Sequence, residues 1–325
     1  MANVTVENVD PVESDGADGI QGNSSLIDGL EESESMALND SSLSVEYFPE
    51  AGHTLWYIIG GVTCIGLLWA LLVMYLVIPN LKTVRRLPVC SYIFGQILIY
   101  LCFLLTSSNS TLIPCEVTGL VYPYAVFACI FWMNVMCYGC YSDFKSKKIY
   151  PTHSLFWQSM FGWGAPTVLL LFYIFTNGFV LLDVTTKPPF SAWMCHEHMF
   201  ELTPILKFFY LPTAALMVLN TIFLGLATIS RANQRYPYHI EDVDSHINYR
   251  RDRQERFQLV LSLFVALFVV YGSDLAAWVG GTRFLWLHYF AGFFAYLHGC
   301  IVFVVCVLNR DIREWIVSKC EKRCN

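Results

Sequence analysis

The sequence has few charged residues: they make up 14% of its 325 residues, while 55% are hydrophobic and 16% aromatic. Soluble domains carry about 25% charged residues, so this composition excludes an ordinary soluble globular protein. Catalytic motifs are lacking as well, since the chain has no His-Glu-x-x-His, no Gly-x-Ser-x-Gly and no Gly-Lys-Ser/Thr phosphate loop. We therefore expect no enzyme, no cofactor and no nucleic-acid partner.

The first 53 residues lack lysine, arginine and cysteine but contain twelve acidic residues. Such a tail, rich in serine and glycine, cannot bury enough apolar surface to fold, so residues 1–53 are expected to be disordered. Residues 1–30 also lack the basic start and apolar core of a cleavable signal peptide. The first membrane span is therefore expected to direct export of the tail.

Seven long apolar stretches follow, from Thr54 to Leu308. An apolar run of roughly 20 residues lets a helix cross ~30 Å of hydrocarbon, and lipid leaves the backbone few alternatives to a helix. The sequence predicts an all-α membrane protein with a seven-transmembrane helix bundle over residues 54–308. The expected spans are Thr54–Ile78, Leu87–Thr106, Leu112–Tyr141, Leu155–Phe175, Ile205–Ile229, Phe257–Val279 and Phe284–Leu308.

The basic residues indicate the orientation of this bundle. Of the 20 Lys and Arg residues, 17 lie in the joins after spans one, three and five and in the C-terminal tail. By the positive-inside rule, the N-terminus is predicted to be extracellular and the C-terminus cytoplasmic. The expected location is the plasma membrane, with several spans in the bilayer. Asn-x-Ser/Thr glycosylation sequons all fall on the predicted outer face, at Asn3, Asn23, Asn39 and Asn109.

The segment 309–325 is expected to form a short amphipathic helix and a cytoplasmic tail. Ile312, Trp315 and Ile316 recur at helical spacing with charged residues between them, a pattern typical of a helix on the inner membrane surface. The alternative is the frayed end of span seven. Cys320 and Cys324 lie beside basic residues, which makes them candidates for lipidation.

We predict a disulfide between Cys115 and Cys195, the two cysteines assigned to the oxidising face; two free thiols are the alternative. Loss of an outer bridge commonly costs ~2–5 kcal/mol, so Cys195→Ser is expected to reduce surface expression, measured by surface labelling. Non-reduced peptides that show both thiols free in mass spectrometry would contradict the bridge. The segment Cys195-His196-Glu197-His198 fits no common zinc spacing, so no metal site is expected there.

Ionisable residues are rare within the predicted spans. Asp274 lies in span six, and a carboxylate at that depth is expected to face the bundle interior, a cavity or a base. It indicates a ligand cavity or, alternatively, a structural ion pair near the outer surface. The candidate cavity residues are Asp274, Trp278, Lys207 and His288. His298 in span seven is expected to be an interior, hydrogen-bonded histidine rather than a pH switch.

Five motifs occur in order on the predicted spans. They are Phe131-Trp-Met-Asn-Val-Met-Cys137, Trp163-Gly-Ala-Pro166, Phe208-Phe-Tyr-Leu-Pro212, Tyr271-Gly272 before Trp278, and His298-Gly-Cys-Ile-Val-Phe303. Together, over about residues 55–318, the chain resembles Methuselah-like G-protein-coupled receptors, which are related to the secretin and adhesion types. It departs from them in having His298 where many relatives carry Gln, and in lacking the large Cys-rich ectodomain.

The resemblance implies a receptor that passes an unidentified extracellular signal to a heterotrimeric G protein through movement of span six. Candidates for the G-protein interface are Arg250, Arg251, Arg253 and Arg256, which equally suit topology anchoring and contact with anionic lipid. A receptor-like scaffold that pairs with another membrane protein, without G-protein coupling, is the alternative. The odd number of spans and the lack of an internal repeat argue against a transporter. A retinal pigment is excluded because the last span has no lysine.

Overall fold

The computed structural model describes residues 50–77, 83–107, 115–145, 155–178, 209–233, 243–280, 285–308, 312–313 and 317. The chain divides into two compact units, and the second, Ala51–Asn325, contains nearly all of these residues. Seven helical segments in the described ranges are long and apolar enough to cross a membrane, and no strand occurs there. The predicted all-α, seven-span fold is confirmed.

The helices agree with the predicted spans to within a few residues at most ends. The fourth span consists of three consecutive pieces, α5, η1 and α6. The elements are α2 (Glu50–Val77), α3 (Thr83–Ser107), α4 (Cys115–Lys145), α5 (Leu155–Ser159), η1 (Met160–Gly164), α6 (Ala165–Gly178), α9 (Leu211–Ala232), α10 (Val243–Gly280) and α11 (Leu285–Val307).

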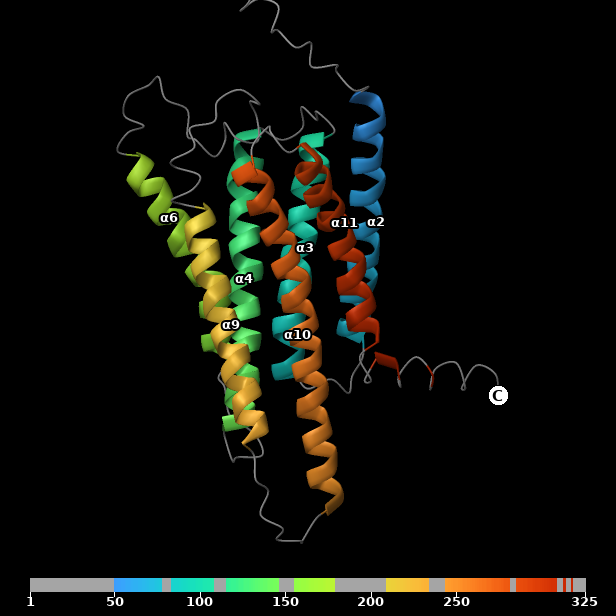
Figure 1. Ribbon diagram of the computed structural model, residues 1–325, viewed down its shortest axis with the longest axis vertical. Helices are drawn as coiled ribbons and strands as arrows, with labels where there is room; N and C mark the ends of the chain where they lie inside the picture. Colours follow the sequence, from blue (N-terminus) through green and yellow to red (C-terminus); the bar gives the residue numbers. More distant parts are fainter. Residues whose placement is uncertain are drawn as a thin grey trace, which may run out of the picture. The chain divides into compact units, whose positions relative to one another are not determined.

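Helix α10 differs most from the sequence prediction, which placed residues 230–256 in an inner loop. It begins at Val243, so the arginine-rich string is helical and continuous with span six. The string consists of strong helix formers, and Arg251 forms an i,i+4 ion pair with Glu255 at 3.3 Å. The loop assignment was wrong for residues 243–256, because hydropathy marks where the apolar run begins rather than where the helix begins. Figure 1 shows α10 continuing beyond the end of α9.

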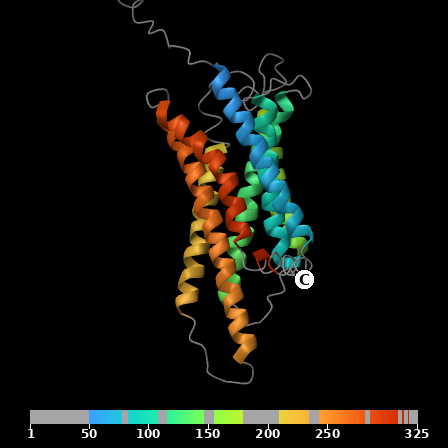
Figure 2. The same cartoon turned by 90° about the vertical axis from the view of Figure 1, so that its right-hand side faces the viewer.

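Helix α4 is the central helix of the described bundle. Its apolar window is 83% buried, whereas the windows of the other six are between 17% and 56% buried. It contacts α3, α9, α10, α6 and η1, and its Trp132 and Met133 are fully buried. Helices α10 and α11 lie side by side in both views (Figures 1 and 2). Large exposed apolar side chains such as Trp157 and Phe175 on the fourth span suit contact with lipid.

The fourth span is interrupted by one π-helical turn, Met160–Gly164. Pro166 follows it and has no N–H to donate to the carbonyl of Gly162, four residues earlier, so the ladder must change locally. Trp163 on this turn faces the central helix, at 5.8 Å from Trp132 and 6.4 Å from Tyr124 between ring centroids. The irregular turn thus fixes the fourth span against α4 through stacked and edge-on aromatic rings.

Candidate functional site

One end of the bundle carries an ion pair between the central helix and α10. This is the end where α4 and α9 finish and α10 begins, bearing Lys145, Arg231 and Arg250, and it is called the basic end below. Arg256 Nη1 on α10 donates to Asp143 Oδ2 on α4 at 2.6 Å. Their side chains are only 18% and 9% exposed, so the pair is shielded from water and joins the two helices.

Small and aromatic neighbours position this ion pair. Gly139 lies four residues before Asp143, on the same face of α4, and a Cβ there would be 2.8 Å from Nη2 of Arg256. The glycine therefore gives the guanidinium room to reach the carboxylate. Beside the pair, Phe144 meets Phe257 edge-on with ring centroids 5.9 Å apart. These contacts hold α10 against α4.

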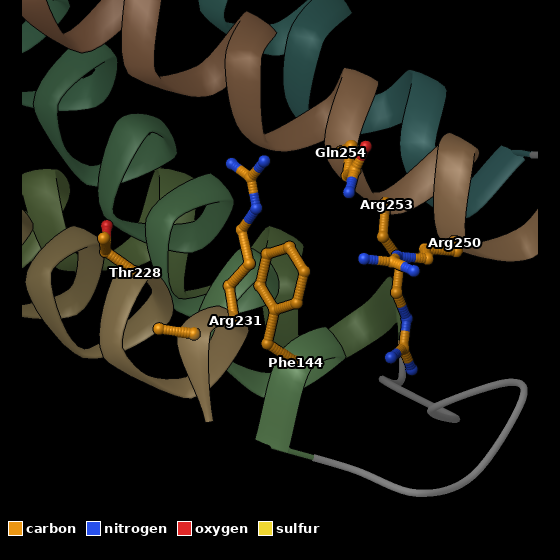
Figure 3. Close-up of a pocket in the computed structure, with 7 residues that line it drawn as sticks. Phe144, Thr228, Arg231, Arg250, Arg253 and Gln254 are labelled. Atoms are coloured by element: carbon orange, nitrogen blue, oxygen red, sulfur yellow. The ribbon is translucent and has the colours of Figure 1, made fainter. Parts of the chain in front are cut away.

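A cavity of about 270 Å³ opens next to these contacts, between α4, α9 and α10 (Figure 3). The Arg231 guanidinium from α9 lies 5.7 Å from the centroid of the Phe257 ring. In Figure 3 the Phe144 ring is seen with Arg231 on one side and Arg250 and Arg253 on the other. The lining residues are Phe144, Thr228, Arg231, Ala232, Arg250, Arg253 and Gln254.

The four arginines predicted as a G-protein interface occupy three different environments. Arg250 and Arg253 line the cavity, and Arg253 is 7% exposed. Arg251 is well exposed and paired with Glu255. Arg256 is the partner of Asp143. The structure therefore brings only two of the four to the cavity, and the G-protein role of all four stays a prediction.

The candidate ligand cavity was predicted around Asp274, at the opposite end of α10. Tyr210, just before α9, donates its hydroxyl to Asp274 Oδ2 at 3.2 Å. Phe209 next to it stacks on Tyr122 of α4, with ring centroids 6.3 Å apart. Asp274 therefore has a neutral donor among its partners, and it links α10 to α9.

The other predicted cavity residues are only partly described. Trp278 lies on α10 and His288 on α11, but their side chains lie outside the described residues of the structure. Lys207 lies wholly outside them. Their place in a ligand cavity stays a prediction.

The seventh span is tied to its neighbours by polar contacts. His298 is buried, and its Nε2 lies 3.2 Å from the Tyr92 hydroxyl on α3, which confirms the predicted interior, hydrogen-bonded histidine. Tyr100 of α3 donates to the carbonyl oxygen of Ala295 at 2.5 Å. Cys64 Sγ of α2 donates to the carbonyl oxygen of Tyr296 at 3.3 Å. Helix α11 is thus fixed to α2 and α3.

Several predicted features lie outside the described residues. Cys115 begins α4, but its side chain and all of Cys195 are not described, so their disulfide stays a prediction. Of the predicted surface helix, Ile312 is fully buried and Val317 is exposed. In the described segments of the chain, no group of three His, Cys, Asp or Glu residues could hold a metal ion. The modification candidates that lie outside the described residues are Asn3, Asn23, Asn39, Asn109, Cys320 and Cys324, and so does the segment 195–198, where no metal site was expected.

Comparison with known proteins points to one kind of receptor. No protein-family model matches the chain. It is 22% identical over 257 residues to the G-protein coupled receptor Mth2 of Drosophila simulans, covering 76% of this chain and 48% of that one. The chain is similar to Methuselah-like receptors. A second relative, the probable G-protein coupled receptor Mth-like 10 of Drosophila melanogaster, is 22% identical over 267 residues, covering 76% of this chain and 46% of that one.

The resemblance seen in the sequence motifs is thereby confirmed, and it is confined to a portion of each relative. The chain spans about half the length of the curated relatives it matches. Both relatives are named as receptors rather than as enzymes. With seven apolar helices, the similarity supports a multi-pass membrane protein.

Sequence reasoning missed Asp143 and the residues around it. Asp143 stands at the very end of the third apolar stretch, beyond the predicted span end at Tyr141. An acid at the end of one span and a run of arginines at the start of another are the signal that could have indicated the ion pair.

Proposed function

We propose that the protein is a G-protein-coupled receptor of Methuselah-like type, which transmits an unidentified extracellular signal to heterotrimeric G proteins. It acts by changing conformation rather than by catalysis. Its N-terminus lies outside the cell, and the basic end faces the cytoplasm of a plasma-membrane receptor. The similarity to named receptors over three quarters of the chain supports this assignment.

The observation that carries the mechanism is the attachment of α10 at two levels, at Asp274 and at Arg256. At the first level Asp274 of α10 accepts a hydrogen bond from Tyr210, and at the second Arg256 of α10 pairs with Asp143. The two α10 residues are eighteen apart, about 27 Å along one helix. A ligand that replaces Tyr210 as the hydrogen-bond partner of Asp274 would favour a different position of the whole of α10.

At the basic end, a G protein needs an opening between α10 and its neighbours. The Asp143–Arg256 pair and the Phe144–Phe257 contact join α10 to α4, and in this proposal they keep that opening closed. An extracellular ligand and an intracellular partner would then both bias one equilibrium, between α10 joined to α4 and α10 displaced from it. Signal transmission in this proposal is the effect that binding at one end of the bundle has on binding at the other.

Neutralising Arg250, Arg251 and Arg253 together by glutamine is expected to reduce G-protein coupling more than surface delivery. All three lie on the first turns of α10 within its apolar window, where a displaced helix would meet its partner. Arg250 and Arg251 are exposed, and an exposed contact is worth only ~0.2–1 kcal/mol, so all three arginines are changed together for a clear loss. G-protein activation and surface expression are measured in the same transfected cells.

A matched control neutralises Lys319, Lys322 and Arg323, which removes the same charge from the same predicted side of the membrane. The control is expected to couple normally. Normal coupling by the α10 triple variant would make those arginines membrane anchors instead. If the unmodified chain activates no G protein, with or without candidate ligands, the receptor assignment is wrong and the scaffold takes its place.

A further inference from the structure

The cavity at the basic end is surrounded by guanidinium groups from two helices. Arg231 comes from α9, and Arg250 and Arg253 come from α10. Gln254 adds an amide, and none of the seven described lining residues is acidic. Positive charges that surround one cavity repel one another. An anion bound among them attracts each of them and so offsets this repulsion.

The cations are positioned before any ligand arrives. Arg253 is 7% exposed, so its side chain is restricted by packing, and Arg231 is exposed but lies over the Phe257 ring, which orients its guanidinium. Phe144 belongs to the wall between them (Figure 3). Groups that are already ordered lose little conformational freedom on binding, which favours a defined site over a diffuse basic surface.

The donors of the cavity select the kind of anion. Guanidinium groups bind phosphate oxygens in bidentate pairs. Thr228 already donates its hydroxyl to the carbonyl oxygen of Leu224 at 2.8 Å, which leaves arginine and amide N–H groups as the donors. A volume of about 270 Å³ lies just below the range of ~300–1,000 Å³ typical of small-molecule pockets. A compact group that carries acceptors only, such as a phosphate monoester, fits these conditions.

The cavity lies at the level where the apolar spans end. The apolar windows finish at Lys145 on α4 and Ala232 on α9, and they begin at Arg250 on α10. Lipid phosphates are found at this level of a bilayer, and clustered basic residues there attract anionic lipids. Ile229 on α9 and Leu261 on α10 are exposed and apolar, which suits acyl chains alongside the same helices.

The geometry points to a binding site for a phosphate-bearing anion, with Arg231, Arg250 and Arg253 as its ligands. The anion is the head group of an anionic phospholipid or a free phosphate ester. Because its ligands come from α9 and α10, the bound anion joins these two helices at the basic end. The site is independent of G-protein coupling, so binding can be tested whether or not the protein signals.

The test uses the purified full chain and two probes. In the first arm, the protein is placed in phosphatidylcholine nanodiscs with or without phosphatidylinositol bisphosphate, and retained lipid is detected by native mass spectrometry. In the second arm, inositol trisphosphate is titrated onto the protein in uncharged detergent and thermal unfolding is followed. The double variant Arg231→Gln with Arg253→Gln is compared with Arg251→Gln, whose side chain pairs with Glu255 and does not line the cavity.

We expect the unmodified protein and Arg251→Gln to bind equally, and the double variant to lose affinity by about tenfold or more, since two charge-assisted contacts are removed. Binding of the lipid alone identifies a head group as the source, and binding of both probes shows that a soluble ester suffices. Where the double variant does not fold, the exposed Arg250→Gln takes its place in both arms. Absence of binding in both arms, or equal binding by cavity variants and control, overturns the proposal.

Discussion

Replacing Asp143 by asparagine is expected to raise G-protein signalling in the absence of agonist by up to about tenfold. The neutral side chain removes the charge that holds Arg256 against α4, in a pair that is largely shielded from water. A loss of about 1.4 kcal/mol from the closed arrangement shifts its equilibrium with the open one tenfold. Basal signalling per receptor at the cell surface is the measurement.

Three further variants separate this pair from general damage to the basic end. Arg256→Gln is expected to raise basal signalling as much as Asp143→Asn, and combining the two is expected to add little. Gly139→Val reaches the same result without changing charge, because its side chain displaces the Arg256 guanidinium. Glu255→Gln breaks the exposed pair with Arg251 and is expected to have no effect. Equal basal signalling in all four variants would refute the role of the Asp143 pair.

Replacing Gly162 by alanine is expected to destabilise the folded bundle by ~1–3 kcal/mol, the usual cost of overpacking. A Cβ at this position would lie 2.7 Å from Cδ2 of Trp132. Trp132 is fully buried on the central helix, so its ring cannot move aside freely. Thermal unfolding in nanodiscs and surface expression measure the effect.

Gly164 supplies the matched control, because it lies in the same π-helical turn and a Cβ added there would meet no other atom within 4 Å. Gly164→Ala makes the same chemical change and is expected to alter stability by less than ~0.5 kcal/mol. Both variants gain the same intrinsic helix propensity when glycine is replaced by alanine. The difference between their stabilities therefore measures the contact with Trp132. Equal unfolding temperatures of the two variants would mean that a side chain at Gly162 does not clash with the Trp132 ring.

The spans themselves could be predicted from the sequence because lipid imposes a simple rule on length and hydropathy. The same rule does not detect a helix that continues beyond its apolar run, so residues 243–256 were assigned to a loop although they are helical. The break in the fourth span follows from Pro166, a local signal that sequence reasoning can use. Structural features that depend on a single segment of the sequence could thus be predicted, except for helix ends that extend beyond the apolar run.

The contacts at the candidate site were less accessible. Asp143 and Arg256 are 113 residues apart, and nothing in either segment specifies which face of its helix meets the other. For Asp274, the bundle interior, a cavity or a base was expected, and the structure shows a tyrosine hydroxyl from Tyr210. The pattern of charged residues in a sequence cannot reveal an uncharged hydrogen-bond donor. Pairing across helices therefore required the structure.

The length of α10 has a mechanical consequence. Its 38 residues contain no proline, so it can act as one stiff lever of about 57 Å. Pivoting by ~5° about Asp274 would move Arg256 by ~2 Å and the far end at Val243 by ~4 Å. The first displacement is comparable with the 2.6 Å separation in the ion pair. A rotation too small to change the packing around Asp274 thus produces a larger displacement further along the helix, enough to separate Arg256 from Asp143.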